Sequence, residues 1–216
     1  MGFGLGMFGA PLLILIDPRF VPAPLLCTAV VITLLLTHRE RHAAEYQDLK
    51  WSLSGRVLGI GAAMFALTVV PTDRDAVLSG SLILTAVGLS ASGLHLAIAP
   101  GSLFGAGALS GLIGTAVSAG GPPMALLYQR ESGSRIRSSL SAYFFFGVVM
   151  SIGGLAIIGR FSWEEVVLAF SLLPGALLGF LISRRTARLL DKGYVRTTVL
   201  VVSGMSGLIV LMTGVL

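Results

Sequence analysis

The chain has 216 residues, of which 55% are hydrophobic and only 12% are charged. Soluble domains carry about a quarter charged residues, so this composition excludes an ordinary soluble protein and indicates that lipid surrounds much of the chain. The net charge of +5 would suggest nucleic acid in a soluble protein, but these basic residues are spread over several short loops, which is typical of a membrane topology signal.

Two apolar stretches, residues 2–16 and 104–128, are rich in glycine and contain prolines. The second includes residues 120–123, with the sequence Gly-Gly-Pro-Pro, where tandem prolines remove backbone donors and clash with the preceding turn. We predict a broken helix there, and a shorter copy of it in residues 2–16, which contain Pro11. The chain enters apolar sequence at once, with no cleavable signal peptide evident, so we expect an upstream stretch to be missing.

Full membrane spans are predicted for the remaining apolar segments, because a spanning helix needs about 20 mostly apolar residues. Six segments have approximately this length: residues 21–37, 51–70, 77–98, 140–158, 166–182 and 195–216. We therefore expect an all-α, polytopic membrane protein. Its single cysteine, Cys27, is interpreted as a small packing residue, and it excludes a disulfide within the chain.

The order of these segments predicts an internal duplication. Residues 1–99 and residues 100–216 each contain a glycine-rich broken segment, a polar turn and three spans. The polar turns are residues 17–20 in the first half and residues 129–137 in the second. We expect these halves to be two transmembrane repeats.

The basic residues indicate how the broken segments cross the membrane. If each broken segment is a re-entrant hairpin, one side of the membrane holds 12 of the 15 Lys and Arg residues. If residues 104–128 cross the membrane once, the most uneven distribution is 10 of these residues on one side and 5 on the other. The basic side comprises the loops at 38–50, 129–137 and 183–194, with Arg56 and Arg196 at the adjoining helix ends. The positive-inside rule favours hairpins, and the two halves are then inverted repeats, as in many secondary transporters.

Ionisable residues are assigned to the loops, and no Lys or Arg is placed at the centre of a predicted span. All ten acidic residues fall outside the spans: Asp17, Glu40, Glu45, Asp48, Asp73, Asp75, Glu131, Glu164, Glu165 and Asp191. Proton relays and cation sites use buried ionisable groups, so this pattern disfavours a carboxylate-based cation pump. Metal ligands are also lacking, and we expect no metal and no cofactor.

An anion site does not require a buried cation. Broken helices expose backbone N–H groups, and a helix N-terminus carries a positive partial charge that favours anions. The expected donors are Thr115, Ser118 and the amides near Gly120 and Gly121. The alternative interpretation is a glycine seam that only allows close helix packing.

Polar residues next to the broken segments are further candidates. Arg137, Ser138 and Ser139 follow the second one, where they could guide an anion to a pore or simply anchor and cap the next helix. Thr28 and Thr33 lie on the corresponding span of the first half, although threonines within membranes more often bond their own backbone.

An intramembrane enzyme is the weakest interpretation. A serine nucleophile needs a histidine base within reach, and Ser118 with His95 is the pair that the sequence offers. No supporting motif surrounds either residue, and we assign no catalytic residue.

The glycine-rich segments resemble those of the sulfite exporter TauE/SafE family of bacterial membrane proteins. The resembling motifs are Gly2-Phe3-Gly4-Leu5-Gly6-Met7-Phe8-Gly9-Ala10-Pro11, Gly111-Leu112-Ile113-Gly114 leading to Gly120-Gly121-Pro122, and Arg137-Ser138-Ser139-Leu140-Ser141-Ala142. The first repeat has Gly9-Ala10-Pro11 where the family typically has consecutive glycines. The resemblance implies transport of sulfite, sulfonates or related organic anions, with Gly9, Pro11 and Pro122 included in the candidate site.

The sequence thus predicts a secondary carrier that crosses the bacterial plasma (inner) membrane several times. Its substrate is expected to be a small anion, which binds between the two broken helices. The alternative is a non-transporting membrane scaffold or accessory subunit. The expected partners are the anionic substrate and the lipid bilayer, with no nucleic acid, and assembly into a homo-oligomer is left open.

Overall fold

The computed structural model describes residues 3–40, 46–71, 74–94, 96–129, 131, 133–190 and 194–215, and every regular element in these ranges is helical. The elements are α1 (Phe3–Ile16), η1 (Pro18–Phe20), α2 (Ala23–Glu40), α3 (Tyr46–Val69), α4 (Asp75–Ala91), α5 (Pro100–Val117), α6 (Gly121–Tyr128), α7 (Gly133–Ile157), α8 (Trp163–Leu190) and α9 (Tyr194–Val215). The expected all-α fold is therefore confirmed.

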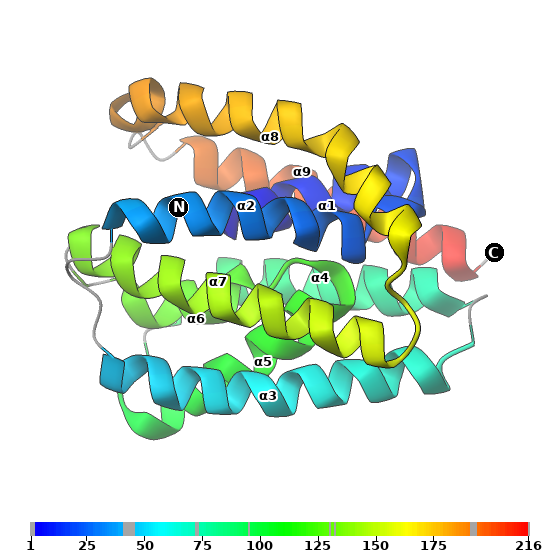
Figure 1. Cartoon of the computed structure of the whole chain (residues 1–216), viewed down its shortest axis with the longest axis horizontal. Helices are drawn as coiled ribbons and strands as arrows, with labels where there is room; N and C mark the ends of the chain where they lie inside the picture. Colours follow the sequence, from blue (N-terminus) through cyan, green and yellow to red (C-terminus); the bar gives the residue numbers. More distant parts are fainter. Residues whose placement is uncertain are drawn as a thin grey trace.

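The long helices lie side by side along one direction (Figure 1). In that view α8, α2, α7 and α3 succeed one another from top to bottom, and each packs against the next. Helices α4 and α9 pack against each other behind this row, while α5 and α6 lie inside the bundle.

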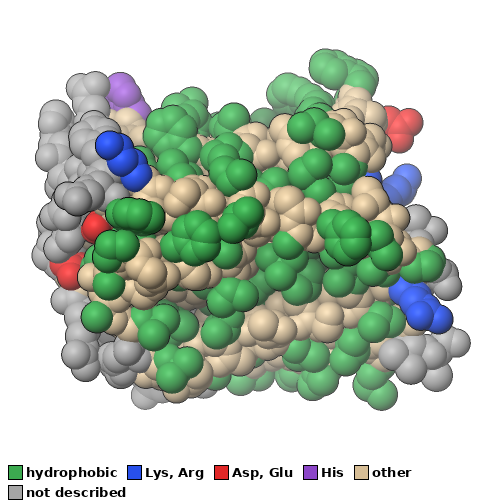
Figure 2. All heavy atoms as spheres, turned by 90° about the horizontal axis from the view of Figure 1, so that it is seen from below, with side chains coloured by type: hydrophobic (Ala, Val, Ile, Leu, Met, Phe, Trp, Pro, Cys, Tyr) green, Lys and Arg blue, Asp and Glu red, His purple; other side chains and the backbone are tan. Residues whose placement is uncertain are grey.

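Four of the described helices, α3, α5, α7 and α8, are long and apolar enough to cross a membrane. Three of the six predicted spans are among them, while α2, α4 and α9 contain shorter apolar stretches. Apolar side chains cover the middle of the face in Figure 2, and charged side chains appear near its two ends. This distribution is the one that a hydrocarbon layer requires.

The predicted break in the second glycine-rich segment is present. Helix α5 ends at Val117, and α6 starts again at Gly121 after three residues. Leu103 and Ala106 of α5 share a core cluster with Leu127 and Tyr128 of α6, so the chain folds back along itself. Residues 100–128 thus form a hairpin that starts and ends at the same end of the bundle (Figure 1).

The predicted break in the first segment is wrong for the described residues, because α1 runs through Pro11. A proline inside a helix leaves the carbonyl four residues earlier without its donor, and here that carbonyl belongs to Met7. The Ser203 hydroxyl of α9 donates to the Met7 oxygen at 2.7 Å. A side chain from a neighbouring helix therefore replaces the lost backbone bond, as transmembrane helices require.

Helix α4 is also shorter than the predicted span 77–98. It ends at Ala91, and Gly93 follows with a φ of +63°. Glycine adopts this left-handed conformation without steric cost and commonly ends helices. The glycine thus ends the helix within the apolar sequence.

Helices α3 and α5 run in parallel and approach so closely that side chains are excluded between them. A Cβ atom at Gly55 would overlap the backbone of Phe104, and one at Gly59 would lie 2.7 Å from the Leu112 nitrogen. On the other helix, a Cβ at Gly107 would overlap the backbone of Ser52. Small residues spaced four apart allow such backbone contact, which replaces the hydrophobic driving force that is absent in lipid.

An ion pair connects three helices at the end of the bundle opposite the start of the α5–α6 hairpin (Figure 1). The Arg160 guanidinium donates to the Asp75 carboxylate at 2.7 Å and to the Leu67 carbonyl at 2.8 Å. Arg160 follows α7, Asp75 starts α4, and Leu67 lies near the end of α3. This contact fixes the ends of α3 and α7, whose middle parts contribute to the site described below, and joins them to the start of α4.

We predict that Gly59→Ala lowers the thermal stability of the purified protein, because the added methyl group forces α3 and α5 apart. Overpacking of this kind costs about 1–3 kcal/mol. Gly61→Ala on the same helix is the matched control, because no atom lies within 4 Å of its added Cβ. Unfolding temperatures measured in detergent would contradict the account if the two variants were affected equally.

Candidate functional site

The tip of the α5–α6 hairpin is held in an uncommon backbone conformation. Ser118 caps α5 with φ 58° and ψ 12°, a left-handed conformation that few residues other than glycine adopt. Its amide donates to the Gly114 carbonyl at 3.0 Å, and its hydroxyl donates to the Pro22 carbonyl at 2.9 Å. The hydroxyl thus anchors the hairpin tip to the start of α2.

The N-terminus of α6 follows directly at Gly121, and prolines occupy the next two positions. Proline fits the first turn of a helix because those N–H groups have no partner within the helix. Gly120 and Gly121 are both buried. The positive end of this short helix therefore lies inside the bundle.

Arg56 is the residue that the sequence interpretation misplaced. We expected it at a helix end on the basic side, but it lies within α3 and its side chain is only 1% exposed. Its guanidinium donates to the Ser110 hydroxyl of α5 at 3.2 Å and to the Ser151 hydroxyl of α7 at 3.4 Å. A buried cation is therefore present between the helices after all.

Helical spacing is the signal that could have identified Arg56 as buried. Ser52, Gly55, Arg56 and Gly59 recur at intervals of three and four residues, which places them on neighbouring positions of one helix face. The two glycines on this face predict close contact with another helix. Arg56 thus belongs to a packing face and not to the loop that precedes it.

The described surroundings of Arg56 supply no counter-charge. Its bonded partners are neutral hydroxyls, and its Cζ atom lies 5.0 Å from the centre of the Tyr143 ring. The buried Nε atom has no hydrogen-bond partner. Because a guanidinium carries five N–H donors, most of its bonding capacity is left for another group.

Two glycines make the space that the guanidinium occupies. A Cβ atom at Gly147 of α7 would overlap the Arg56 side chain, and one at Gly114 of α5 would lie 3.3 Å from its terminal nitrogen. The position of the buried charge therefore depends on the absence of side chains at these residues.

Hydroxyl groups connect Arg56 to the hairpin tip. The Ser110 hydroxyl, which accepts from Arg56, donates to the Gly120 carbonyl at 2.5 Å. The Ser151 hydroxyl is hydrogen-bonded to Thr115 at 2.8 Å and donates to the Gly147 carbonyl at 2.9 Å. These hydroxyls thereby connect Arg56 to α5 and to the turn at Gly120.

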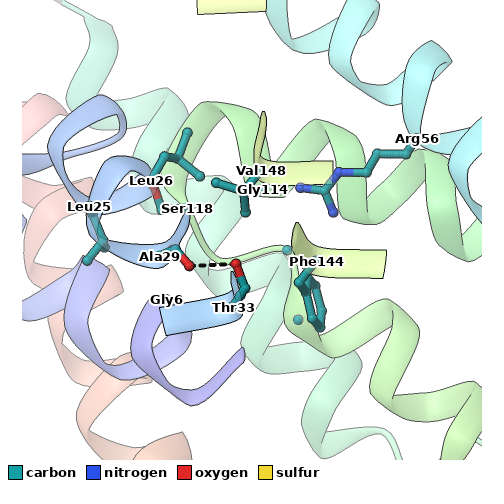
Figure 3. A pocket seen from close by; sticks show the side chains of 12 residues that line it. Gly6, Leu25, Leu26, Ala29, Thr33, Arg56, Gly114, Ser118, Phe144 and Val148 are labelled. Atoms are coloured by element: carbon teal, nitrogen blue, oxygen red, sulfur yellow. Dashed lines mark hydrogen bonds between the residues drawn. The ribbon is translucent and has the colours of Figure 1, made fainter. Parts of the chain in front are cut away.

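A small cavity of about 30 Å³ lies between Arg56 and the hairpin tip (Figure 3). Its lining residues come from α1, α2, α3, α5, the hairpin turn, the start of α6 and α7: Gly6, Leu25, Leu26, Ala29, Thr33, Arg56, Gly114, Ser118, Gly120, Gly121, Phe144 and Val148. The Arg56 side chain reaches from α3 toward Gly114 and Val148. The cavity therefore has one cationic wall, a hairpin wall and an apolar wall.

The predicted site residues divide into those at the cavity and those away from it. Ser118, Gly120 and Gly121 line it, and Thr115 belongs to the hydroxyl network beside it. The candidates that do not line it are Gly9, Pro11, Thr28, Pro122, Ser138 and Ser139. The side chain of Arg137 lies outside the described residues, although its backbone belongs to α7.

The two threonines of α2 differ in position. Thr28 is buried and donates to the Pro24 carbonyl at 3.0 Å and weakly to the Ala169 carbonyl of α8 at 3.4 Å. Thr33 lines the cavity and donates to the Ala29 carbonyl at 2.7 Å (Figure 3). Each hydroxyl bonds backbone carbonyls, so Thr33 contributes an acceptor oxygen to the cavity and Thr28 ties α2 to α8.

No group of three or more metal-ligating side chains occurs among the residues that the structure describes. The Ser118 hydroxyl is engaged with the Pro22 carbonyl, and His95 lies outside the described residues. The cavity thus has a largely apolar lining, to which hydroxyls, backbone groups and one guanidinium are added.

Helices that are long and apolar enough to cross a membrane, with a hairpin inside the bundle, define a multi-pass helical membrane protein. The family model described as Sulfite exporter TauE/SafE matches residues 1–210, so the chain belongs to this family of membrane transporters. The predicted family resemblance is thereby confirmed. Neither the curated proteins nor the solved structures contain a match to the chain.

We predict that Gly147→Ala destabilises the protein, because its methyl group takes the space of the Arg56 guanidinium. The cost is expected to shrink in an Arg56→Ala background, where that space is free, so the two changes should be non-additive. Gly153→Ala on the same helix has no atom near its added Cβ and serves as the control. Additive losses in unfolding temperature would show that the guanidinium does not occupy this position.

Proposed function

We propose that this chain is a secondary carrier for a small anion, in particular sulfite, an organosulfonate or a related sulfur-containing or organic anion, in the bacterial plasma membrane. The observation that carries this proposal is the buried Arg56 guanidinium at the cavity wall, with no carboxylate bonded to it in the described structure. We place the substrate between this guanidinium and the turn at Ser118, Gly120 and Gly121.

The cost of burying a charge is the argument for an anionic substrate. An unpaired ion inside an apolar region is unfavourable by several kcal/mol even after the protein relaxes around it. An anion in the cavity compensates this charge and fills the free N–H donors, because charge-assisted hydrogen bonds to a guanidinium are about twice as strong as neutral ones. Ionisable residues within membranes commonly mark such substrate pathways.

A scaffold or accessory subunit explains the same features less well. Neutral residues would satisfy Ser110 and Ser151 at lower cost, so a purely structural bundle has no use for a buried cation beside an open cavity. An anion carrier can use both, the cation to bind the substrate and the cavity to hold it. Family membership also favours transport.

We further propose that residues 1–99 and 100–216 are inverted repeats that meet at this cavity. The packing of the helices supports this arrangement, since α2 contacts α8 as α7 contacts α3, and α1 contacts α9 as α6 contacts α4. Gly175 and Gly179 of α8 also repeat the spacing of Gly55 and Gly59 of α3. Gly6 of α1 lies against the Ser118 carbonyl, which brings the glycine-rich segments of both halves together.

We predict that Arg56→Gln reduces the rate of sulfite flux into proteoliposomes about ten- to a hundredfold. This range follows from a loss of about 1.5–3 kcal/mol for a hydrogen bond to a charged group, with a factor of ten for each 1.4 kcal/mol. Arg56→Lys keeps the charge but loses the planar donor geometry, and it should retain an intermediate rate.

Arg74→Gln is the matched control, because Arg74 is exposed at the start of α4 and its loss changes the net charge equally. Its flux should equal that of the wild type. Unchanged flux in Arg56→Gln would exclude the proposed binding site, and absence of sulfite flux in the wild type would favour the scaffold interpretation.

A further inference from the structure

The charge around the cavity comes from one side chain. Helices α1, α5 and α6, together with the turn at 118–120, contain no Asp, Glu, Lys, Arg or His. On α2, α3 and α7, every Asp, Glu, Lys, Arg or His other than Arg56 lies among the first or last five residues of its helix. The titratable side chain that faces the guanidinium is Tyr143 of α7, whose hydroxyl donates to the Gly107 carbonyl at 3.4 Å.

Charge balance then distinguishes singly from doubly charged anions. A singly charged anion beside Arg56 gives a neutral pair inside the bundle. A doubly charged anion leaves one negative charge uncompensated, with only hydroxyls and backbone dipoles near it. Because an unpaired charge is strongly unfavourable in such surroundings, the doubly charged form loses most of the gain from binding.

The size of the cavity further restricts which anions fit. One water requires roughly 10–15 Å³, so a cavity of about 30 Å³ favours small anions over large ones. The planar guanidinium fork matches the oxygen atoms of a compact oxoanion, which can accept two parallel N–H bonds. The apolar wall formed by Leu25, Leu26 and Val148 offers no partner to a second charged group.

We infer that this site selects singly charged oxoanions over doubly charged ones of the same size, so that it carries sulfite in its hydrogensulfite form. This inference rests on the proposed function. It adds the charge state in which the substrate binds and the residue that compensates this charge. Arg56 supplies the single positive charge that compensates the singly charged anion.

A pair of isosteric anions tests the inference. Methanesulfonate and sulfate each have one sulfur and four attached non-hydrogen atoms, but they carry one and two negative charges. We expect wild-type proteoliposomes to carry methanesulfonate at least about tenfold faster than sulfate, since one uncompensated buried charge costs more than this factor. Vesicles without protein give the leak that is subtracted from both rates.

The pH dependence of sulfite flux provides a second measurement. Hydrogensulfite loses its proton near neutral pH, so the flux at fixed total sulfite should rise from slightly alkaline to slightly acidic pH. Methanesulfonate stays singly charged over this interval, and the ratio of the two rates removes any effect of pH on the protein itself.

Variants at Arg56 separate the inference from a general effect on transport. Arg56→Lys should preserve the preference for methanesulfonate at a reduced rate. Arg56→Gln should lower the flux of both anions toward the leak, because neither anion then has a compensating charge. Equal or faster transport of sulfate by the wild type would overturn the charge selection while leaving the carrier function intact. Absence of flux for sulfite, methanesulfonate and sulfate alike would contradict the proposed function itself.

Discussion

A guanidinium inside an apolar helix bundle is the constraint on which the rest of this structure depends. Arg56 is almost fully buried, and the groups that it reaches are the hydroxyls of Ser110 and Ser151. Neutral hydroxyls lower the cost of such a charge but do not cancel it. We propose that an anion in the adjoining cavity completes the compensation, and this proposal links the fold to transport.

Glycine provides the room for this arrangement. The backbones of α3 and α5 touch at Gly55, Gly59 and Gly107, which brings Ser110 within reach of Arg56. Gly147 leaves space for the guanidinium on the opposite side. The close backbone contacts thus make the space for the buried charge. A glycine seam for close helix packing, which the sequence left as an alternative, is therefore compatible with the proposed anion site.

The sequence predicted the features that depend on local chemistry. Tandem prolines at 122 and 123 clash with a preceding helical turn but fit the first turn of a new helix, so the break at the hairpin tip followed directly from them. The features that depend on distant partners were missed. A continuous α1 requires Ser203, which lies 196 residues from Met7, and the burial of Arg56 requires the glycines of two other helices. Counting charges by their nearest loop assigned Arg56 to the membrane surface, although its spacing from Gly55 and Gly59 placed it on a packing face.

An experimental structure determined with selenite, the selenium analogue of sulfite, tests the central claim most directly. Anomalous scattering locates the selenium atom independently of the protein. We expect a selenium peak within hydrogen-bonding reach of the Arg56 guanidinium, beside Ser118 and Gly120. A carboxylate paired with Arg56, or selenite bound elsewhere with this cavity empty, would contradict the account.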